Sequence, residues 1–359
     1  MCMAFQAEGI VKRAGFAPGG EPRMQEGLNL EEPLLMNLEN TVYLKDNKLV
    51  MVDRRKLPGE IAPVTCSNYE DVARAIEDMV VQGAGDIAIA AGFGLYLAAV
   101  DLEESNSDFN MGKLENAVTR LCATRPTGFH LVALLDKAMK KVRGDKRPAS
   151  VVIHEVLEDV LLRQRGMSQA TGRHAEPLLN SGDTILTHCF AGPGLLYMLK
   201  YAKENGKEIR VICTETRPYL QGARLTAWSV SQLGLETILI TDNMPAHFMS
   251  RGVIDKVFTA ADRIAMDGTV ANKIGTLQLA ILAKYYNIPF YILGYGGPDK
   301  RTLNGADIPV EERDPQEVLE FRGIPVSGPD VKAFYPAFDL TPGNLVTGVI
   351  TETGAQMSE

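Results

Sequence analysis

Short apolar runs alternate with helical stretches through the second half of the chain, and this alternation limits the possible folds more than any other feature. Each run is bounded by polar or turn residues, which is typical of a buried strand. Buried strands separated by helices form a parallel sheet that is covered on both faces and connected by right-handed crossovers. The runs are residues 184–187, 209–212, 237–240, 257–259 and 289–293.

The first part of the chain has a different pattern. Residues 41–44 and 48–52 are strand-like and are joined across Asp46-Asn47, a pair that tolerates turn geometry, so we expect a β-hairpin there. Helical patterns follow, and the strand-rich part begins somewhere between residues 144 and 180. A chain of 359 residues is long enough for about two domains. The expected fold class is therefore α/β.

Two places before the strand-rich part suit a bound phosphate. Residues 67–70 have a capping-box pattern, and the helix that they open ends at a turn containing Gly83 and Gly85. Such a turn leaves N–H groups free for a phosphate, although it also suits a plain connection between helices. Arg125 lies in a loop because Pro126 breaks the preceding helix. That arginine is either a bidentate phosphate ligand or a surface cation.

Polar side chains also follow the predicted strands, most densely between Thr214 and Thr276. The carboxyl ends of parallel strands emerge at one edge of a sheet, and ligands bind outside that edge. We therefore interpret this stretch as one wall of an active site. The groups placed at the edge are Cys189, Arg217, Asp242, Asp262 and the turn at residues 294–297.

Cys189 and Asp262 are the candidates for proton transfer. Cys189 precedes a predicted helix, whose N-terminus would favour the thiolate near neutral pH, although buried structural cysteines share this pattern. Asp262 closes an apolar strand and is either a general base or a helix cap. His188 and Cys189 are neighbours on a strand and point to opposite faces, so no Cys–His dyad is expected. Asn272 and Lys273 would add an amide and a cation for an anion, which together suits chemistry on a phosphorylated polyol.

Charge and missing motifs exclude several classes of function. The net charge of −8 is spread along the chain, so binding of nucleic acid is not expected. No apolar run reaches the ~18–20 residues of a membrane span, and the start lacks a signal-peptide pattern. The five cysteines are scattered without CxxC, and HExxH is absent, so we expect no metal and a cytoplasmic protein with reduced thiols. The absence of GxGxxG after the first strand argues against a dinucleotide cofactor.

Several long motifs are nearly gapless and follow one another in a specific order. They are residues 214–226, Asp242-Asn243-Met244, residues 261–265, residues 271–276, residues 311–315 and residues 335–342. In this order they resemble the S-methyl-5-thioribose-1-phosphate isomerase family. That family is similar to the alpha, beta and delta regulatory subunits of initiation factor 2B and to ribose-1,5-bisphosphate isomerase. The likeness extends from about Leu35 to Gly354.

The resemblance implies an architecture and an activity. It implies a smaller N-terminal helical domain with a small β-sheet (31–147), a Rossmann-like catalytic domain (148–359) and an N-terminal arm (1–30). It also implies a homodimer without a cofactor that converts S-methyl-5-thioribose 1-phosphate or 5-deoxyribose 1-phosphate to the ribulose 1-phosphate, in methionine or 5-deoxyribose salvage. The catalytic residues would be Cys189 and Asp262. The substrate contacts would be Gln82, Gly83, Ala84, Arg125, Gln221, Asn272 and Lys273.

Three departures from the family pattern cluster at the expected site. Gln82 stands where the family usually has an arginine, Phe190-Ala191 replaces Asn-Thr, and residues 128–130 replace Ala-Val-Asn. Because Cys189 and Asp262 persist, we interpret the departures as a change at the far end of the sugar, as in a paralogue acting on 5-deoxyribose 1-phosphate. Two other readings stay open: a ribose-1,5-bisphosphate isomerase, and a non-catalytic regulatory subunit.

Overall fold

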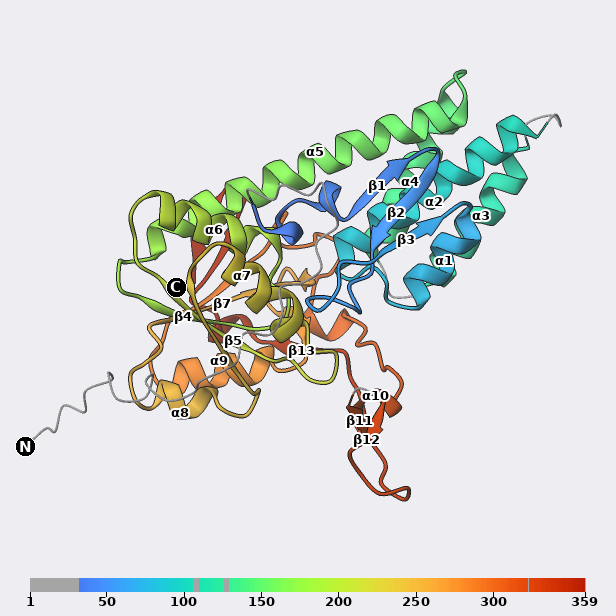
Figure 1. Cartoon of the computed structure of the whole chain (residues 1–359). Coiled ribbons are helices and arrows are strands. Elements are labelled where there is room, and N and C mark those ends of the chain that lie inside the picture. Colours follow the sequence, from blue (N-terminus) through green and yellow to red (C-terminus); the bar gives the residue numbers. More distant parts are fainter. Residues whose placement is uncertain (1–31, 106–109, 126–128, 322, 359) are drawn as a thin grey trace, which may run out of the picture.

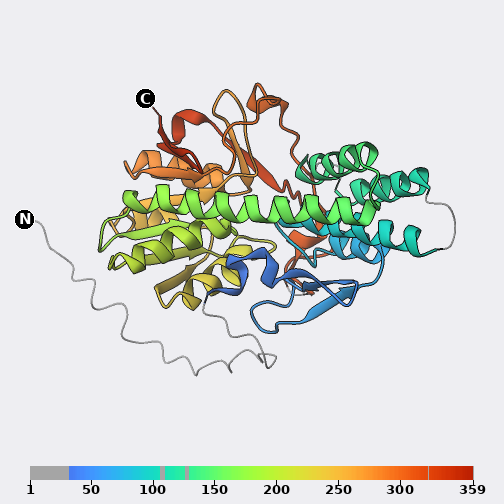
Figure 2. The same cartoon turned by 90° about the horizontal axis from the view of Figure 1, so that it is seen from above.

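A computed structural model of the chain describes residues 32–105, 110–125, 129–321 and 323–358. The predicted arm at residues 1–30 and the departure at Gly128 lie outside the described residues. Helices α1 to α4 and a small sheet lie on one side of the molecule, and a large sheet with its own helices lies on the other (Figure 1). The long helix α5 (Ala149–Ala175) extends along both parts (Figure 2).

The large sheet has seven strands in the order β15-β14-β10-β7-β4-β5-β6. All neighbours from β14 to β6 are parallel, and β15 is antiparallel at one edge. All five predicted strands are confirmed, whereas β14 and β15 were not foreseen. The bounds are β4 (Thr184–Thr187), β5 (Arg210–Thr214), β6 (Glu236–Ile240), β7 (Lys256–Ala260), β10 (Phe290–Leu293), β14 (Gly348–Thr351) and β15 (Gly354–Met357).

Helices cover both faces of this sheet, as the strand pattern predicts. One face packs against α6 (Gly192–Glu204), α7 (Trp228–Gln232) and the end of α5, and a π-helical turn at Gly222–Ala227 leads into α7. The other face packs against α8 (Pro245–Met249) and α9 (Thr276–Tyr285). Each face therefore has its own apolar core.

The predicted hairpin is confirmed as β1 (Val42–Lys45) and β2 (Lys48–Val52), with β3 (Pro63–Cys66) added as an unforeseen third strand. Asp46 and Asn47 have φ values of 50° and 57°, the left-handed geometry that tight hairpin turns need. The sheet packs on a helical core formed by α1 (Tyr69–Glu77), α2 (Ala84–Glu104), α3 (Met111–Ala123), α4 (Phe129–Gly144) and the first part of α5.

Two local predictions need correction. The capping box was placed one residue too early, because Asn68, not Ser67, caps α1 by accepting a hydrogen bond from Asp71 N at 2.9 Å. The sequence also showed no apolar segment of membrane-spanning length. Among the described residues, α2 is long and apolar enough to cross a membrane by length and composition alone, but 67% of its apolar stretch is buried inside the protein, as in a core helix.

Helix α5 contributes to the helical core through its first half and to the large-sheet core through Ala175. The two parts are therefore packed on one continuous helix. The predicted domain boundaries at 30/31 and 147/148 stay predictions.

Two further small sheets contain strands from the C-terminal part of the chain. One contains β8 (Arg263–Ile264), β9 (Val270–Lys273) and β13 (Phe338–Thr341). The other is the hairpin of β11 (Glu320–Phe321) and β12 (Ile324–Pro325), which follows α10 (Gln316–Leu319) and projects from the body in Figure 1. Short 3-10 helices occur at Leu34–Met36, Leu38–Asn40, Glu176–Leu178, Gly305–Asp307 and Gly343–Leu345.

The turn after β5 leaves no room for a side chain at Gly222. A Cβ there would lie 1.9 Å from the carbonyl oxygen of Thr214. We expect Gly222→Ala to lower the free energy of unfolding by about 3 kcal/mol, because backbone would have to move. The control is Gly166→Ala in α5, where nothing lies within 4 Å. That exposed helical site should gain about 0.5–1 kcal/mol. Equal urea midpoints for the two variants would contradict this account of the turn.

Candidate active site

The candidate site lies at the switch point of the large sheet. The chain passes from β4 to β5 and β6 in one direction and then returns to place β7 on the other side of β4. Cys189 follows β4 and Asp262 follows β7, so both leave the carboxyl ends of neighbouring parallel strands. Open α/β sheets bind ligands in the crevice at this point.

Hydrogen bonds from the turn after β5 hold Cys189 in place. The backbone N–H of Cys189 donates to Thr216 Oγ1 at 2.9 Å, and Thr226 Oγ1 donates to the carbonyl oxygen of Cys189 at 2.6 Å. Cys189 has a φ of 58°, an uncommon value for a residue with a side chain. The strand-end residue is therefore held by two threonines of the 214–226 motif.

The expected low pKa of Cys189 is wrong. Burial raises the pKa of this thiol to about 11, and this effect exceeds the opposing influence of Lys273 and of the Phe190 backbone. The N-terminus of α6 does not reverse the shift, since the N–H of Gly194 donates to the Tyr295 hydroxyl at 2.6 Å. Cys189 is a protonated thiol at neutral pH.

Asp262, like Cys189, has a pKa that burial raises. Burial raises the pKa of its carboxyl to about 6, with Lys273 opposing the rise and Glu311 adding to it. The charge of Asp262 in turn raises the pKa of Cys189, which places the two groups within electrostatic reach of each other. Asp262 precedes strand β8 and no helix, so the capping interpretation is wrong.

Lys273 and Asn272 extend from β9 in the neighbouring small sheet. The Lys273 ammonium lies 5.0 Å from the Phe338 ring centroid and 6.0 Å from that of Tyr335. Asn272 is buried, and its side-chain amide donates to Thr276 Oγ1 at 2.9 Å. The charge of Lys273 acts on the pKa of both Cys189 and Asp262, so the fold brings these three residues near one another. Asn272 is adjacent to Lys273 in the chain.

The turn at Gln82-Gly83-Ala84 begins α2, and Gly83 has a φ of 100°. The Oε1 atom of Gln82 is buried and has no hydrogen-bond partner among the described residues. Beneath the turn lies Arg54, an almost fully buried arginine that sequence reasoning missed. Its guanidinium pairs with Asp86 at 2.6 Å and donates to the carbonyl oxygen of Gln82.

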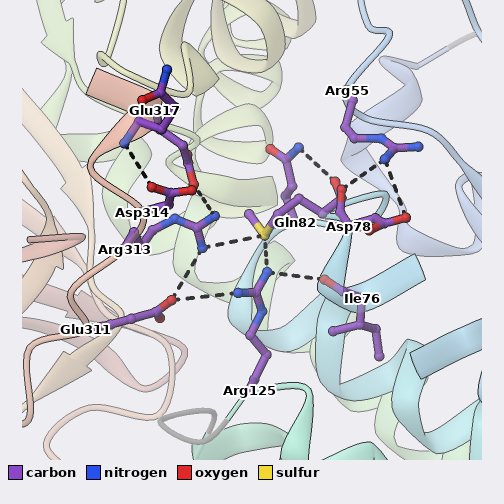
Figure 3. A network of polar contacts seen from close by, with 11 residues as sticks. Arg55, Ile76, Asp78, Gln82, Arg125, Glu311, Arg313, Asp314 and Glu317 are labelled. Atoms are coloured by element: carbon purple, nitrogen blue, oxygen red, sulfur yellow. Dashed lines mark hydrogen bonds and ion pairs between the residues drawn. The ribbon is translucent and has the colours of Figure 1, made fainter. Parts of the chain in front are cut away.

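Arg125 belongs to a polar network between α1 and the C-terminal segment (Figure 3). Its guanidinium donates to the carbonyl oxygen of Ile76 at 3.2 Å and lies 3.7 Å from Glu311 Oε1, so it is no free surface cation. Gln221 is buried, and its Oε1 also lacks a partner among the described residues. Glu311 links this network to Asp262, since its charge acts on the pKa of both Arg125 and Asp262.

Two predicted edge residues have structural roles. Asp242 accepts hydrogen bonds from the backbone N–H groups of Thr216 and Arg217 at 2.8 and 2.7 Å. The Arg217 guanidinium donates to the carbonyl oxygens of Val318 and Glu320 and so anchors α10 and its hairpin. His188 uses both ring nitrogens elsewhere, on Thr214 and on Ile274 O, which agrees with the expected absence of a Cys–His dyad.

Positive φ values mark this region beyond Cys189. Met79, Thr216 and Leu220 have φ values of 60°, 64° and 60°. For residues with branched or bulky side chains these are outliers, which often mark functional sites. Phe190, one of the departures, packs on the apolar cluster that includes Leu225, so packing accounts for its aromatic ring.

A cavity of about 400 Å³ lies away from these residues, between α4 and Arg301, and contains none of the predicted site residues. Its lining is mostly basic. The lining residues are Ala133, Asp136, Lys137, Lys140, Lys141 and Arg301.

Comparison with known proteins gives a consistent set of relatives. Residues 80–358 match the model of the initiation factor 2 subunit family. The chain is 41% identical over 329 residues to methylthioribose-1-phosphate isomerase 1 of Pseudothermotoga lettingae, covering 88% of this chain and 94% of that protein. Its structure is similar to the crystal structure of 5-methylthioribose 1-phosphate isomerase from Pyrococcus horikoshii, with a TM-score of 0.78 and 36% sequence identity. The match covers 88% of this chain and 92% of that chain. The crystal structure of the translation initiation factor eIF-2B, subunit delta, from A. fulgidus is also similar, with a TM-score of 0.76 and 33% sequence identity. This match covers 88% of this chain and 95% of that chain.

Proposed function

This chain belongs to the methylthioribose-1-phosphate isomerase family within the initiation factor 2 subunit family, and we propose that it is an aldose–ketose isomerase converting a 5-modified ribose 1-phosphate to the ribulose 1-phosphate. The observation that carries the proposal is the pair of Cys189 and Asp262 after neighbouring strands at the switch point, within the electrostatic reach of Lys273. The reaction belongs to methionine salvage or to 5-deoxyribose salvage.

The two groups of the pair have different protonation states, which supports different roles for them in this proposal. With a pKa of about 6, Asp262 is ionised at neutral pH and acts as the base. With a pKa of about 11, Cys189 keeps its proton and acts as the acid. Burial raises the pKa of both groups, so the carboxyl remains the stronger acid of the two.

The phosphate on C1 blocks ordinary ring opening because C1 carries no free hydroxyl. In this proposal the bond between C1 and the ring oxygen breaks, and the ring oxygen takes a proton from Cys189. One hydrogen moves from C2 to C1, and the C2 hydroxyl loses its proton to Asp262 as the ketone forms. C2 is oxidised and C1 is reduced, so no external redox partner is needed. Loss of a deuterium label from C2 into solvent would exclude a direct hydride shift.

The remaining predicted contacts hold the substrate in this proposal. The N–H groups of the Gln82-Gly83-Ala84 turn suit the phosphate, because a helix N-terminus favours an anion. Arg125 and Lys273 supply positive charge, and the side chains of Gln221 and Asn272 suit hydroxyl groups. The protein is proposed to act as a homodimer in the cytoplasm, in line with the family resemblance and with the free thiols of the four described cysteines.

Turnover of methylthioribose 1-phosphate beside 5-deoxyribose 1-phosphate tests the proposal, with purified protein and no added cofactor. We expect conversion of at least one of the two sugars, because they differ only at C5, away from the reacting C1 and C2. A kcat/KM favouring the thioether places the protein in methionine salvage, and the reverse places it in 5-deoxyribose salvage. Activity on neither sugar would contradict the proposal and favour a non-catalytic subunit.

A further inference from the structure

We propose that Arg313 is a further substrate-binding residue, whose guanidinium contacts the substrate phosphate together with Arg125. The inference rests on the proposed function, since it concerns the phosphate of that substrate.

Arg313 reaches the site from the C-terminal segment. Its backbone N–H donates to the carbonyl oxygen of Tyr335 at 2.9 Å. Its guanidinium carbon lies 5.6 Å from the ring centroid of Tyr219 and 5.8 Å from that of Tyr335. The ring of Tyr335 also neighbours the ammonium of Lys273, 6.0 Å from its centroid. Arg313 is therefore separated from Lys273 by a single aromatic side chain.

The guanidinium groups of Arg313 and Arg125 are close to each other. They lie 3.3 and 3.7 Å from the same oxygen, Glu311 Oε1, and both contact the sulfur of Met79 (Figure 3). Burial, and then the charge of Arg313, lowers the pKa of Arg125. The two guanidinium groups, each on a side chain only 14% exposed, share the Glu311 carboxylate in this structure, and the substrate phosphate would compete with that carboxylate for the same nitrogens.

Several buried atoms of these two arginines and of the predicted substrate contacts have no hydrogen-bond partner. Among the described residues, the Nε atoms of Arg125 and Arg313 and the Oε1 atoms of Gln82 and Gln221 have no hydrogen-bond partner. Buried polar groups are nearly always paired, so each exception asks for an explanation. Three of these four side chains belong to substrate contacts predicted from the resemblance. The fourth, Arg313, is a further donor of the same kind beside them.

Arg54 is the other arginine near the position of Gln82, but its hydrogen-bonding groups are already engaged. One terminal nitrogen donates to the carbonyl oxygen of Gln82, and the other pairs with Asp86 at 2.6 Å. With a side chain only 2% exposed, it stabilises the turn from below. Arg313 also pairs with Glu317 Oε1 at 2.8 Å, and the second oxygen of that carboxylate, on the neighbouring helix α10, is buried without a partner among the described residues.

Steady-state kinetics of Arg313→Gln tests the inference. We expect KM for the pentose 1-phosphate to rise about 10- to 100-fold, the effect of losing a charge-assisted hydrogen bond to phosphate, with a much smaller change in kcat. Adding Gln82→Arg to this variant should restore most of the affinity. Arg163→Gln is the matched control, because Arg163 is an exposed arginine of α5 that pairs only with Asp159 among the described residues. Its KM should not change.

Binding of inorganic phosphate, measured by calorimetry, separates this inference from the proposed function. Wild-type protein should bind phosphate, and Arg313→Gln should bind it at least about tenfold more weakly. If Arg313→Gln does not fold, the same comparison applies to Arg313→Lys, which keeps the charge but loses the bidentate fork. Unchanged KM and phosphate affinity, or no phosphate binding by the wild type, would overturn the inference. Absence of isomerase activity in the wild type would contradict only the proposed function.

Discussion

Asp262→Asn is expected to lower kcat by about 10²- to 10⁴-fold, because the amide cannot accept the proton that the reaction releases. The same change should raise the free energy of unfolding at neutral pH. Burial raises the pKa of this carboxyl from 3.8 to about 6, so folding opposes its ionisation. Since one pKa unit corresponds to about 1.4 kcal/mol and the side chain is partly exposed, a gain of about 1–3 kcal/mol is expected.

The sign of this effect with pH follows from the same shift. The folded state holds the proton of Asp262 more tightly than the unfolded state does. The loss of folding stability caused by burying the ionised carboxylate is therefore absent below about pH 4, grows between pH 4 and 6, and is complete above pH 6. Stability thus decreases as the pH rises, whereas activity increases. The value of kcat/KM should fall as the pH falls through about 6, because the base becomes protonated. Urea unfolding of the variant at pH 4 and pH 8 checks the first trend, and a pH profile of the wild type checks the second.

Asp242→Asn provides the contrast for Asp262. Its carboxylate accepts two backbone hydrogen bonds at the same sheet edge, so its loss should destabilise the fold. A variant of Asp262 that loses stability as Asp242→Asn does, or that retains near wild-type turnover, would contradict the assigned role of Asp262.

Cys189→Ser should also lower kcat by about 10²- to 10⁴-fold, because a serine hydroxyl is a much weaker acid than the thiol. The fold should persist. The contacts of Thr216 and Thr226 with this residue involve its backbone, which the substitution leaves unchanged. Turnover and the circular dichroism melting curve of the variant check both expectations.

Cys213→Ser is the matched control for Cys189. Cys213 is fully buried in β5, and burial raises the pKa of its thiol to about 12. The new hydroxyl should cost about 1–3 kcal/mol of stability while kcat is maintained. If the two serine variants lose activity to the same extent, the loss reflects packing and the acid role of Cys189 is wrong.

Periodicity and strand spacing predicted the central architecture well. Strands β4, β5, β7 and β10 are almost entirely buried, so each is a short apolar run bounded by turns, whereas β6 at the sheet edge is partly exposed. Strand β15 contains Gly354 and Gln356 at an exposed edge, and β13 follows a proline-rich segment, so neither has that signature. The resemblance placed the predicted site residues, but their catalytic and binding roles stay predictions.

Long-range contacts explain what the sequence did not indicate. The position of Cys189 before a helix predicts a thiolate, but the hydroxyl of Tyr295, distant in the sequence, accepts the hydrogen bond of the Gly194 N–H at that helix N-terminus. Arg313 meets Met79 across 234 positions of the chain, a contact that no local pattern encodes. The pKa values of Cys189 and Asp262 likewise depend on surroundings assembled only in the fold.

The most direct test of the isomerase account is to follow a pentose 1-phosphate labelled with ¹³C at C1 and C2 by NMR, with the purified protein and no cofactor. The account predicts that the C2 signal moves to a ketone position while C1 becomes a methylene carbon that still carries phosphate. Release of inorganic phosphate without a ketone signal, or unchanged spectra for both the methylthio and the deoxy sugar, would contradict it.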